Sequence, residues 1–391
     1  MNFMQIYANK VLYLNDFALP MKKLLSILAT LISIVNLSAN DKSKVDFVYD
    51  VDFETRFDNR EFGNSGFSPS MTIFGACLTP SVGVSVKANG EHRLMVGVDV
   101  MKDFGSGKSC DLFNEMTLHY NYSKKIGNTL LGINAGIFSR DLMGGSYSEA
   151  FFSDSLKFYD RNLEGLLITF KRPQAYFEVG CDWMGQYSPT VREKFMIFSA
   201  GEGKVLPFMN LGYAAYMLHF ANSDRSKGLV DNILCNPYAI FDFGDKADFQ
   251  KLQLRLGWLQ AMQRDRRYKG YFVFPYGIEC DQHLRNWNVG IHNKMFFGHD
   301  MMPYYDDIDN AGLKYGTDLY YGDPFYRIHD REGEGFGFYD RLEVYYEPSF
   351  GKYLKLRVAA LFHFHGMTYT GCAQVISLRF DLNGFLKNKK N

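Results

Sequence analysis

Residues 45–62 alternate in polarity over most of their length. The odd positions carry Phe47, Tyr49, Val51, Phe53 and Phe57, whereas most even positions carry charged side chains. Successive side chains of a β-strand point to opposite faces, so the pattern predicts a strand with an apolar medium on one side and water on the other. The alternation is longer than the about 5–6 residues of a typical soluble strand and covers the about 9–11 that a tilted strand needs to cross a bilayer.

The same period of two recurs along the chain. The clearest hairpin joins 71–88 to 91–104 through Asn89-Gly90, a pair that supplies the positive φ angles of a two-residue turn. Counting 45–62, about 16 strands are expected, and the others cover 111–123, 129–139, 162–171, 174–184, 192–200, 205–220, 230–243, 248–262, 270–281, 284–297, 336–347, 352–365 and 371–382.

The connections alternate between short turns and generally longer loops, of which 140–161 and 298–335 are the longest. An even strand number with this alternation is typical of a membrane barrel whose termini share one side. The sequence therefore predicts an all-β fold, a transmembrane antiparallel up-and-down β-barrel with short periplasmic turns and longer extracellular loops. A soluble exported β-sandwich is the alternative fold.

Composition agrees with a membrane sheet. Aromatic residues make up 16% of the chain, and the 26 Tyr and 36 Gly suit an aromatic girdle and tight turns. The formal net charge is zero, so no basic surplus indicates a nucleic-acid partner. The six cysteines form no CxxC pair, and neither a zinc site nor a disulfide is predicted.

An export signal precedes the first strand. Met21-Lys22-Lys23 is followed by the apolar run 24–37 and by Ser38-Ala39, the order of a cleavable secretory signal. The expected organisation is an upstream extension at 1–20, a signal peptide at 21–39 and one barrel at 40–391. Its strands lie within 45–382, and a basic tail follows at 383–391.

The closing strand carries alternating apolar residues from Val375 to Phe380. Together with the signal and the two-faced strands, it resembles the Gram-negative outer-membrane β-barrel class and, by size, its porin-like members. The resemblance implies an outer-membrane location, contact with outer-membrane lipids, and recognition of Phe380 by the barrel-assembly machinery. The chain departs from the class because 381–391 continues past that aromatic residue.

Charged side chains are expected to line the lumen, and a porin-like channel for small polar solutes is the function they favour. An acidic first strand would lie beside basic residues of the last two strands. The alternative is that these charges form ion pairs that brace the lumen. The residues are Asp50, Asp52, Glu54, Arg56, Asp58, Arg60, Lys355, Arg357, Arg379 and Asp381.

The loop 298–335 is rich in acidic and aromatic residues. It is predicted either to contact glycans, with rings stacking on sugars, or to fold as a plug into the pore. A plugged barrel with a surface glycan-binding or structural role is therefore the second function considered. The residues concerned are Tyr304, Tyr305, Asp306, Asp307, Tyr320, Tyr321 and Asp323.

Metal binding and catalysis have weaker signals. His363 and His365 share a strand face, but no third ligand is identifiable, so neither a metal nor a cofactor is expected. His219, His292 and His299 lie in no recognisable nucleophile motif, and the chain is expected not to be an enzyme. A lipid-modifying outer-membrane hydrolase is the third function considered. The solute and the oligomeric state are left open.

Overall fold

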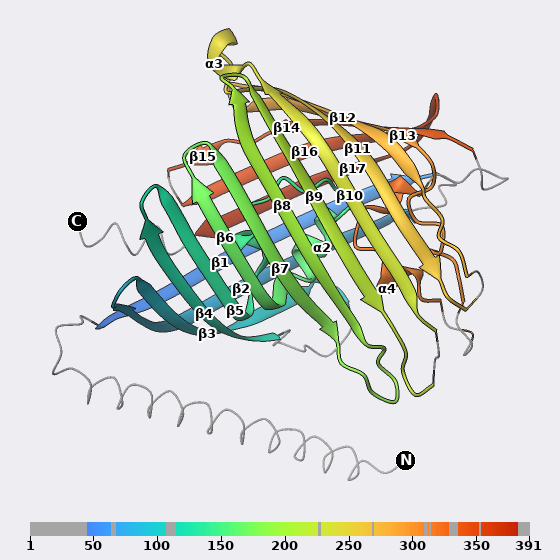
Figure 1. Cartoon of the computed structure of the whole chain (residues 1–391). Helices are drawn as coiled ribbons and strands as arrows, with labels where there is room; N and C mark the ends of the chain where they lie inside the picture. The colour runs from blue at the N-terminus through green and yellow to red at the C-terminus, as the bar shows by residue number, and fades with distance from the viewer. Residues whose placement is uncertain are drawn as a thin grey trace.

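The computed structural model describes residues 45–63, 68–106, 115–225, 228–267, 270–308, 312, 314–327, 335–351 and 353–381. The expected upstream extension, signal peptide and basic tail lie outside these ranges. Sixteen long strands form one antiparallel sheet that closes on itself (Figure 1). They are β1 (Val45–Phe62), β2 (Met71–Lys87), β3 (Glu91–Asp103), β4 (Glu115–Ile126), β5 (Thr129–Ser139), β6 (Asn162–Arg172), β7 (Ala175–Gly185), β8 (Lys194–Leu206), β9 (Met209–Phe220), β10 (Val230–Asp242), β11 (Lys251–Asp265), β12 (Tyr276–Asn286), β13 (Val289–Gly298), β14 (Gly337–Tyr346), β16 (Leu354–His365) and β17 (Thr368–Asp381).

Each long strand pairs with its neighbours in chain order, and β14 pairs directly with β16. The two-residue β15 (Ser349–Phe350) adds only to the end of β16. Closure comes from β1 and β17, whose register runs from Asp52 opposite Asp381 to Phe62 opposite Gly371. The expected up-and-down barrel is confirmed. Each long strand has a hydrogen-bonded neighbour on both sides, as a membrane-spanning sheet requires.

Two turns differ from the sequence prediction. Residues 201–204 lie inside β8, and the chain turns at Pro207-Phe208 instead. Residues 281–283 lie inside β12, and the chain turns at Trp287-Asn288, whose φ angles are 49° and 65°. Both central residues of a type I′ turn need positive φ, and tryptophan rarely adopts it, so this turn has no recognisable signature in the sequence.

One end of the barrel holds the start of β1 and the end of β17, and the connections there are short. The connections at the opposite end are generally longer. We call the two ends the short-turn end and the long-loop end. The connection between β16 and β17 is an exception, because Gly366-Met367 replaces the longer loop that was expected. The helical turn α3 (Gly244–Ala247) lies at the short-turn end between β10 and β11 (Figure 1).

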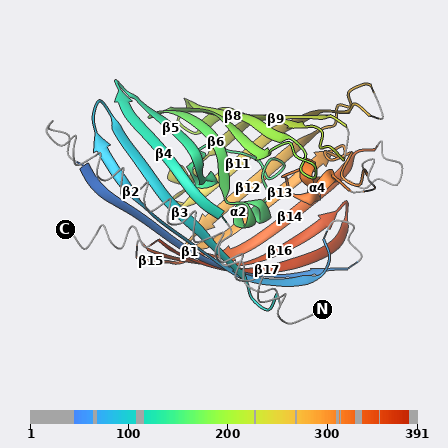
Figure 2. The ribbon, with the colours of Figure 1, turned by 90° about the horizontal axis from the view of Figure 1, so that it is seen from below.

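Two long loops fold back into the barrel. The first connects β5 to β6 and contains η1 (Arg140–Leu142) and α2 (Asp154–Tyr159); the second connects β13 to β14 and contains α4 (Gly316–Leu319) and η2 (Pro324–Tyr326). Figure 2 shows α2 within the ring of strands. We call the described residues 140–161 and 299–327 of these loops the plug.

The plug forms one hydrophobic core with the inner wall. Phe151, Tyr315 and Leu319 are almost fully buried and belong to the same cluster as inward-facing side chains of β6 to β11. The two plug loops also bond to each other, because Ser153 N donates to Tyr321 O at 2.8 Å and Asp323 N donates to Glu149 O at 2.8 Å. Part of the lumen is therefore a packed protein interior.

Candidate functional site

A cavity of about 390 Å³ remains between the plug and the wall formed by β1, β16 and β17. On the β1 side it is lined by Arg56, Asp58, Arg60 and Phe62, which are the even-numbered residues of that strand. Alternation therefore also directs Asp50, Asp52 and Glu54 to the lumen side. On the outer side, Phe57 packs edge-on against Phe74 of β2.

Asp58 is the most buried carboxylate of the β1 row, with 5% of the residue exposed. Arg60 donates to its Oδ2 through Nε at 3.1 Å and Nη2 at 2.8 Å, and Arg56 lies 3.8 Å from the same oxygen. Arg60 also donates to Ser155 of α2 at 3.2 Å. The guanidinium therefore links the barrel wall to the plug.

Several of the other predicted lumen charges form ion pairs. Glu54 accepts from Arg161 of the plug at 3.3 Å, and Arg379 donates to Asp141 of the plug at 2.8 Å and lies 3.9 Å from Asp52. Arg357 donates to Glu343 at 2.8 Å and to Glu347 at 2.7 Å. Lys355 is exposed. The backbone of Asp381 pairs with β1, but its side chain lies outside the described part of the chain.

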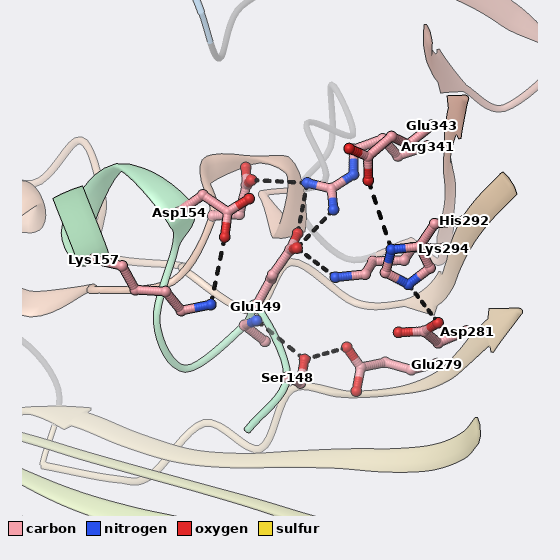
Figure 3. A network of polar contacts seen from close by, with 12 residues as sticks. Ser148, Glu149, Asp154, Lys157, Glu279, Asp281, His292, Lys294, Arg341 and Glu343 are labelled. Atoms are coloured by element: carbon pink, nitrogen blue, oxygen red, sulfur yellow. Dashed lines mark hydrogen bonds and ion pairs between the residues drawn. The ribbon is translucent and has the colours of Figure 1, made fainter. Parts of the chain in front are cut away.

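A buried ionic cluster locks the two plug loops to the wall. Arg341 of β14 donates to Glu149 of the first loop, with Nη1 2.6 Å from Oε2, and it lies 3.6 Å from Asp323 of the second loop. Lys294 of β13 donates to the same Glu149 carboxylate. Figure 3 shows Glu149 between Arg341 and Lys294. We call Glu149, Lys294, Asp323 and Arg341 the latch.

The two carboxylates of the latch titrate differently. Burial by itself would raise the pKa of Glu149, but Arg341 and Lys294 outweigh it and hold that pKa well below its ordinary value. Burial raises the pKa of Asp323 to about 6, because the opposing effect of Arg341 is smaller and the nearby Glu149 carboxylate adds to the rise. At neutral pH the latch thus holds one firmly ionised carboxylate and one near its titration point.

A second polar contact holds the first loop through Glu279 of β12. Ser148 donates to this carboxylate, Tyr326 donates to it at 2.6 Å, and Arg255 of β11 donates to its other oxygen at 3.3 Å. Ser148 and Glu279 point toward each other in Figure 3. The Ser148 hydroxyl is thus engaged with a carboxylate. Neither Ser148 nor Glu149 was singled out from the sequence, because the loop 140–161 has no alternation to show which side chains are inside.

The aromatic and acidic residues of the second loop mainly build the plug. Tyr304 and Tyr320 are buried in its core, and Tyr305 stacks under Arg327, with the guanidinium 4.1 Å from the ring centre. The remaining residues also have partners: Asp306 accepts from Lys314 at 3.1 Å and from Arg327, Asp307 accepts from Tyr315 at 3.2 Å, and the ring of Tyr321 lies 5.4 Å from Lys194.

The histidines occupy different surroundings. His363 stacks on Phe325 of the plug at 4.1 Å, and its Nδ1 lies 3.0 Å from the Tyr339 hydroxyl. His292 lies between two lumen carboxylates, 2.6 Å from Asp281 and 3.6 Å from Glu343. Among the described residues, no group of three or more His, Cys, Asp or Glu side chains has an arrangement that could hold a metal ion.

Two histidines lie at the long-loop end. His219 is flanked in β9 by the inward-facing, buried Leu218 and Phe220, so it points outward, and its ring stacks on Phe195 of β8 at 4.8 Å. His299 follows β13 and packs on Phe336 at 4.2 Å.

On the closing strand, Phe380 lies opposite Phe53 of β1. Its role in assembly stays a prediction.

Comparison with known proteins supports the barrel class. The loop-deletion mutant OmpTdeltaL8 of the Vibrio cholerae outer-membrane protein OmpT has a TM-score of 0.51 at 11% identity, covering 87% of this chain and 100% of that one. Pseudomonas aeruginosa OccK3 has a TM-score of 0.48 at 9% identity, covering 86% of this chain and 95% of that one. OprD of the same organism has a TM-score of 0.46 at 8% identity, with the same two coverages. No curated protein sequence matches. The chain therefore has the fold of a Gram-negative outer-membrane β-barrel, as the resemblance implied.

A family model described as lipid A 3′-O-deacylase-type matches residues 39–217, which is less than half of the chain and ends within β9. This finding corrects one expectation. The sequence was predicted to encode a protein that is not an enzyme, and that prediction is wrong, because the matching model describes an enzyme family. The alternating strands that define a barrel are shared by channels and barrel enzymes, so the pattern could not separate the two.

Proposed function

We propose that the protein hydrolyses an acyl ester of a lipid A-type lipid in the outer leaflet. The observation that carries the proposal is the match of 39–217 to the lipid A 3′-O-deacylase-type model. The packed plug adds support, because an enzyme acting on a membrane lipid meets its substrate at the rim or outer surface and needs no open lumen.

Ester hydrolysis needs a group that takes a proton from the attacking water while the ester C–O bond breaks to give a fatty acid and a hydroxyl. His219 is the histidine best placed for that role, because it faces outward at the long-loop end, where outer-leaflet lipid lies. It comes two residues after the matched range. His119, which lies inside the range, faces the lumen, and its Nε2 is 3.0 Å from Asn134 Oδ1.

The test is the mass of lipid A after incubation with the purified full-length protein in detergent. The wild type is expected to release one fatty acid, and unchanged lipid A would overturn the proposal. His219→Asn should lower the rate by about a hundredfold or more if it is the general base. His119→Asn tests the alternative base inside the matched range. His92→Asn, at the short-turn end, is the matched control and should leave the rate unchanged.

A second candidate is a channel for small polar solutes that conducts when the plug moves. The charged β1 row and the 390 Å³ cavity beside it favour this function. In planar bilayers the intact protein should show little conductance, and deletion of 300–334 should raise it clearly. Equal, low conductance of both proteins, with the barrel folded, would exclude the channel.

A further inference from the structure

Five neighbouring strands place one outward-facing side chain each at the same level near the long-loop end. Each member lies directly opposite the next in the strand register. The residues before or after them on the same strands, such as Asp182, Leu218 and Asp265, are buried on the inner side. We call this set the rim row; its members are Trp183, Phe195, His219, Asp231 and Arg264.

The next outward level toward the short-turn end is entirely apolar or weakly polar. It contains the register partners Cys181, Ile197, Met217, Ile233 and Met262. Charged side chains on the lipid face cost about 2–4 kcal/mol at the bilayer midplane but only about 0–1 near the interface. Outward side chains change from apolar at this level to charged in the rim row, which therefore lies at the boundary between hydrocarbon and headgroups.

Arg266, which follows β11, gives the charged part of the rim row a surplus of arginine. Asp231 accepts from Arg264 Nε at 3.0 Å and Nη2 at 2.8 Å, and also from Arg266 Nε at 2.9 Å and Nη2 at 3.0 Å. One carboxylate thus balances two guanidiniums, and the Arg266 side chain is 47% exposed. The Arg264 guanidinium also lies 4.3 Å from the centre of the Phe272 ring, which holds it in place.

A guanidinium has five N–H donors in a fixed plane. In the contacts of the described residues, each of these two arginines uses two donors on Asp231, so three remain on each for another acceptor. His219, directly opposite Asp231, adds an imidazole N–H in either neutral tautomer. Phosphate is an acceptor that paired guanidiniums bind strongly, because its oxygens match the planar fork.

We propose that the rim row, together with the adjacent Arg266, binds the phosphate group of an outer-leaflet lipid headgroup, with Arg264 and Arg266 as the phosphate ligands. Trp183 and Phe195, which stack on each other at 5.2 Å, lie at the same level on β7 and β8, where aromatic residues anchor a barrel at the headgroups. The site goes beyond the proposed hydrolysis, since binding requires no ester cleavage and its charged residues lie outside the matched range 39–217.

The experiment measures lipid retained by the purified full-length protein in native mass spectrometry. The probes are lipid A with two phosphates and the same lipid with its phosphates removed. The test variant is Asp231→Asn with Arg264→Gln and Arg266→Gln, which removes all three charges together and leaves none unpaired. We expect it to bind the phosphorylated lipid at least about tenfold more weakly, since each charge-assisted hydrogen bond lost costs about that factor. It should bind the dephosphorylated lipid as the wild type does.

The matched control is Arg172→Gln, which removes an outward-facing arginine at the short-turn end, where it donates to Thr129 at 2.8 Å. Its binding should be unchanged. The single variant Arg266→Gln, at an exposed position, serves if the triple variant does not fold. Equal binding of both lipids by the wild type would overturn the site, and so would displacement of the lipid by equimolar inorganic phosphate. Binding without hydrolysis would refute only the proposed enzymatic function.

Discussion

At the residue scale, the latch depends on one carboxylate with two cationic partners. Glu149 is buried and bonds to both Arg341 and Lys294. Buried ion pairs add little to stability relative to an apolar replacement, but removal of one member leaves an uncompensated charge. The latch therefore specifies where the first plug loop docks more than it stabilises the whole protein.

Glu149→Gln should weaken docking of the plug by about 3–5 kcal/mol, because Arg341 and Lys294 lose their shared counter-charge. Hydrogen exchange of residues 148–153 measures the effect, and faster exchange is expected. Lys157→Gln is the control, because Lys157 forms only an exposed pair with Asp154 at 3.4 Å and should change exchange little. Equal exchange in both variants would contradict the role of the latch.

Asp323 should make plug docking depend on pH. Its pKa is about 6 in the docked plug and about 3.9 in an unfolded chain. A raised pKa means that the docked state holds its proton more tightly, so this contribution is complete below about pH 4 and is lost as pH rises through about 6. Docking should weaken by on the order of 1 kcal/mol between pH 5 and 8.

Hydrogen exchange of residues 319–327 across pH 5–8, corrected for intrinsic rates, tests this dependence. Asp323→Asn should make the corrected profile flat, because it removes the titrating carboxyl. The scan stays above pH 5 because Glu149 acts in the opposite direction, with stability lost only as pH falls below its unfolded value of about 4.3. A wild-type profile that is already flat would refute the assignment.

At the element scale, the two plug loops meet without space for a side chain at Gly322. A Cβ atom there would lie 2.2 Å from the carbonyl oxygen of Ala150. Gly322→Val should therefore separate the loops at a cost of about 1–3 kcal/mol and speed exchange in both of them, while the strands keep their protection. Gly63→Ala is the control, since a Cβ atom added at Gly63 would have nothing within 4 Å. Faster hydrogen exchange in only one of the two loops would contradict the prediction that this contact holds them together.

At the scale of the whole molecule, barrel closure is independent of the plug. The ladders join every long strand to two others, and β1 pairs with β17 over residues 52–62. The full-length protein and a variant lacking 300–334 should therefore both show heat-modifiable mobility in detergent gels. Loss of that mobility would show that the barrel needs the second plug loop to close.

Much of the barrel follows from the sequence because strand parity is a local property. The alternation in residues 45–62 indicates two faces, and the chain does turn at Asn89-Gly90, whose φ angles are 50° and 140°. The connection has three residues rather than the expected two, because Lys87 pairs with Glu91 and Ala88 belongs to the loop. The turn at Trp287-Asn288 escaped prediction because Trp287 rarely adopts a positive φ angle, although Asn288 does so readily, and strand pairing imposes the conformation. Local propensity fails where the surrounding ladder decides the backbone.

The sequence by itself determined the fold class and the approximate strand order, since a period of two and short turns are encoded by neighbouring residues. Only the tertiary structure decided what the loops do. The latch joins Glu149 to Arg341, and the rim row aligns Trp183 with Arg264 across five strands. Both depend on loop folding and strand register, which bring together residues far apart in the chain.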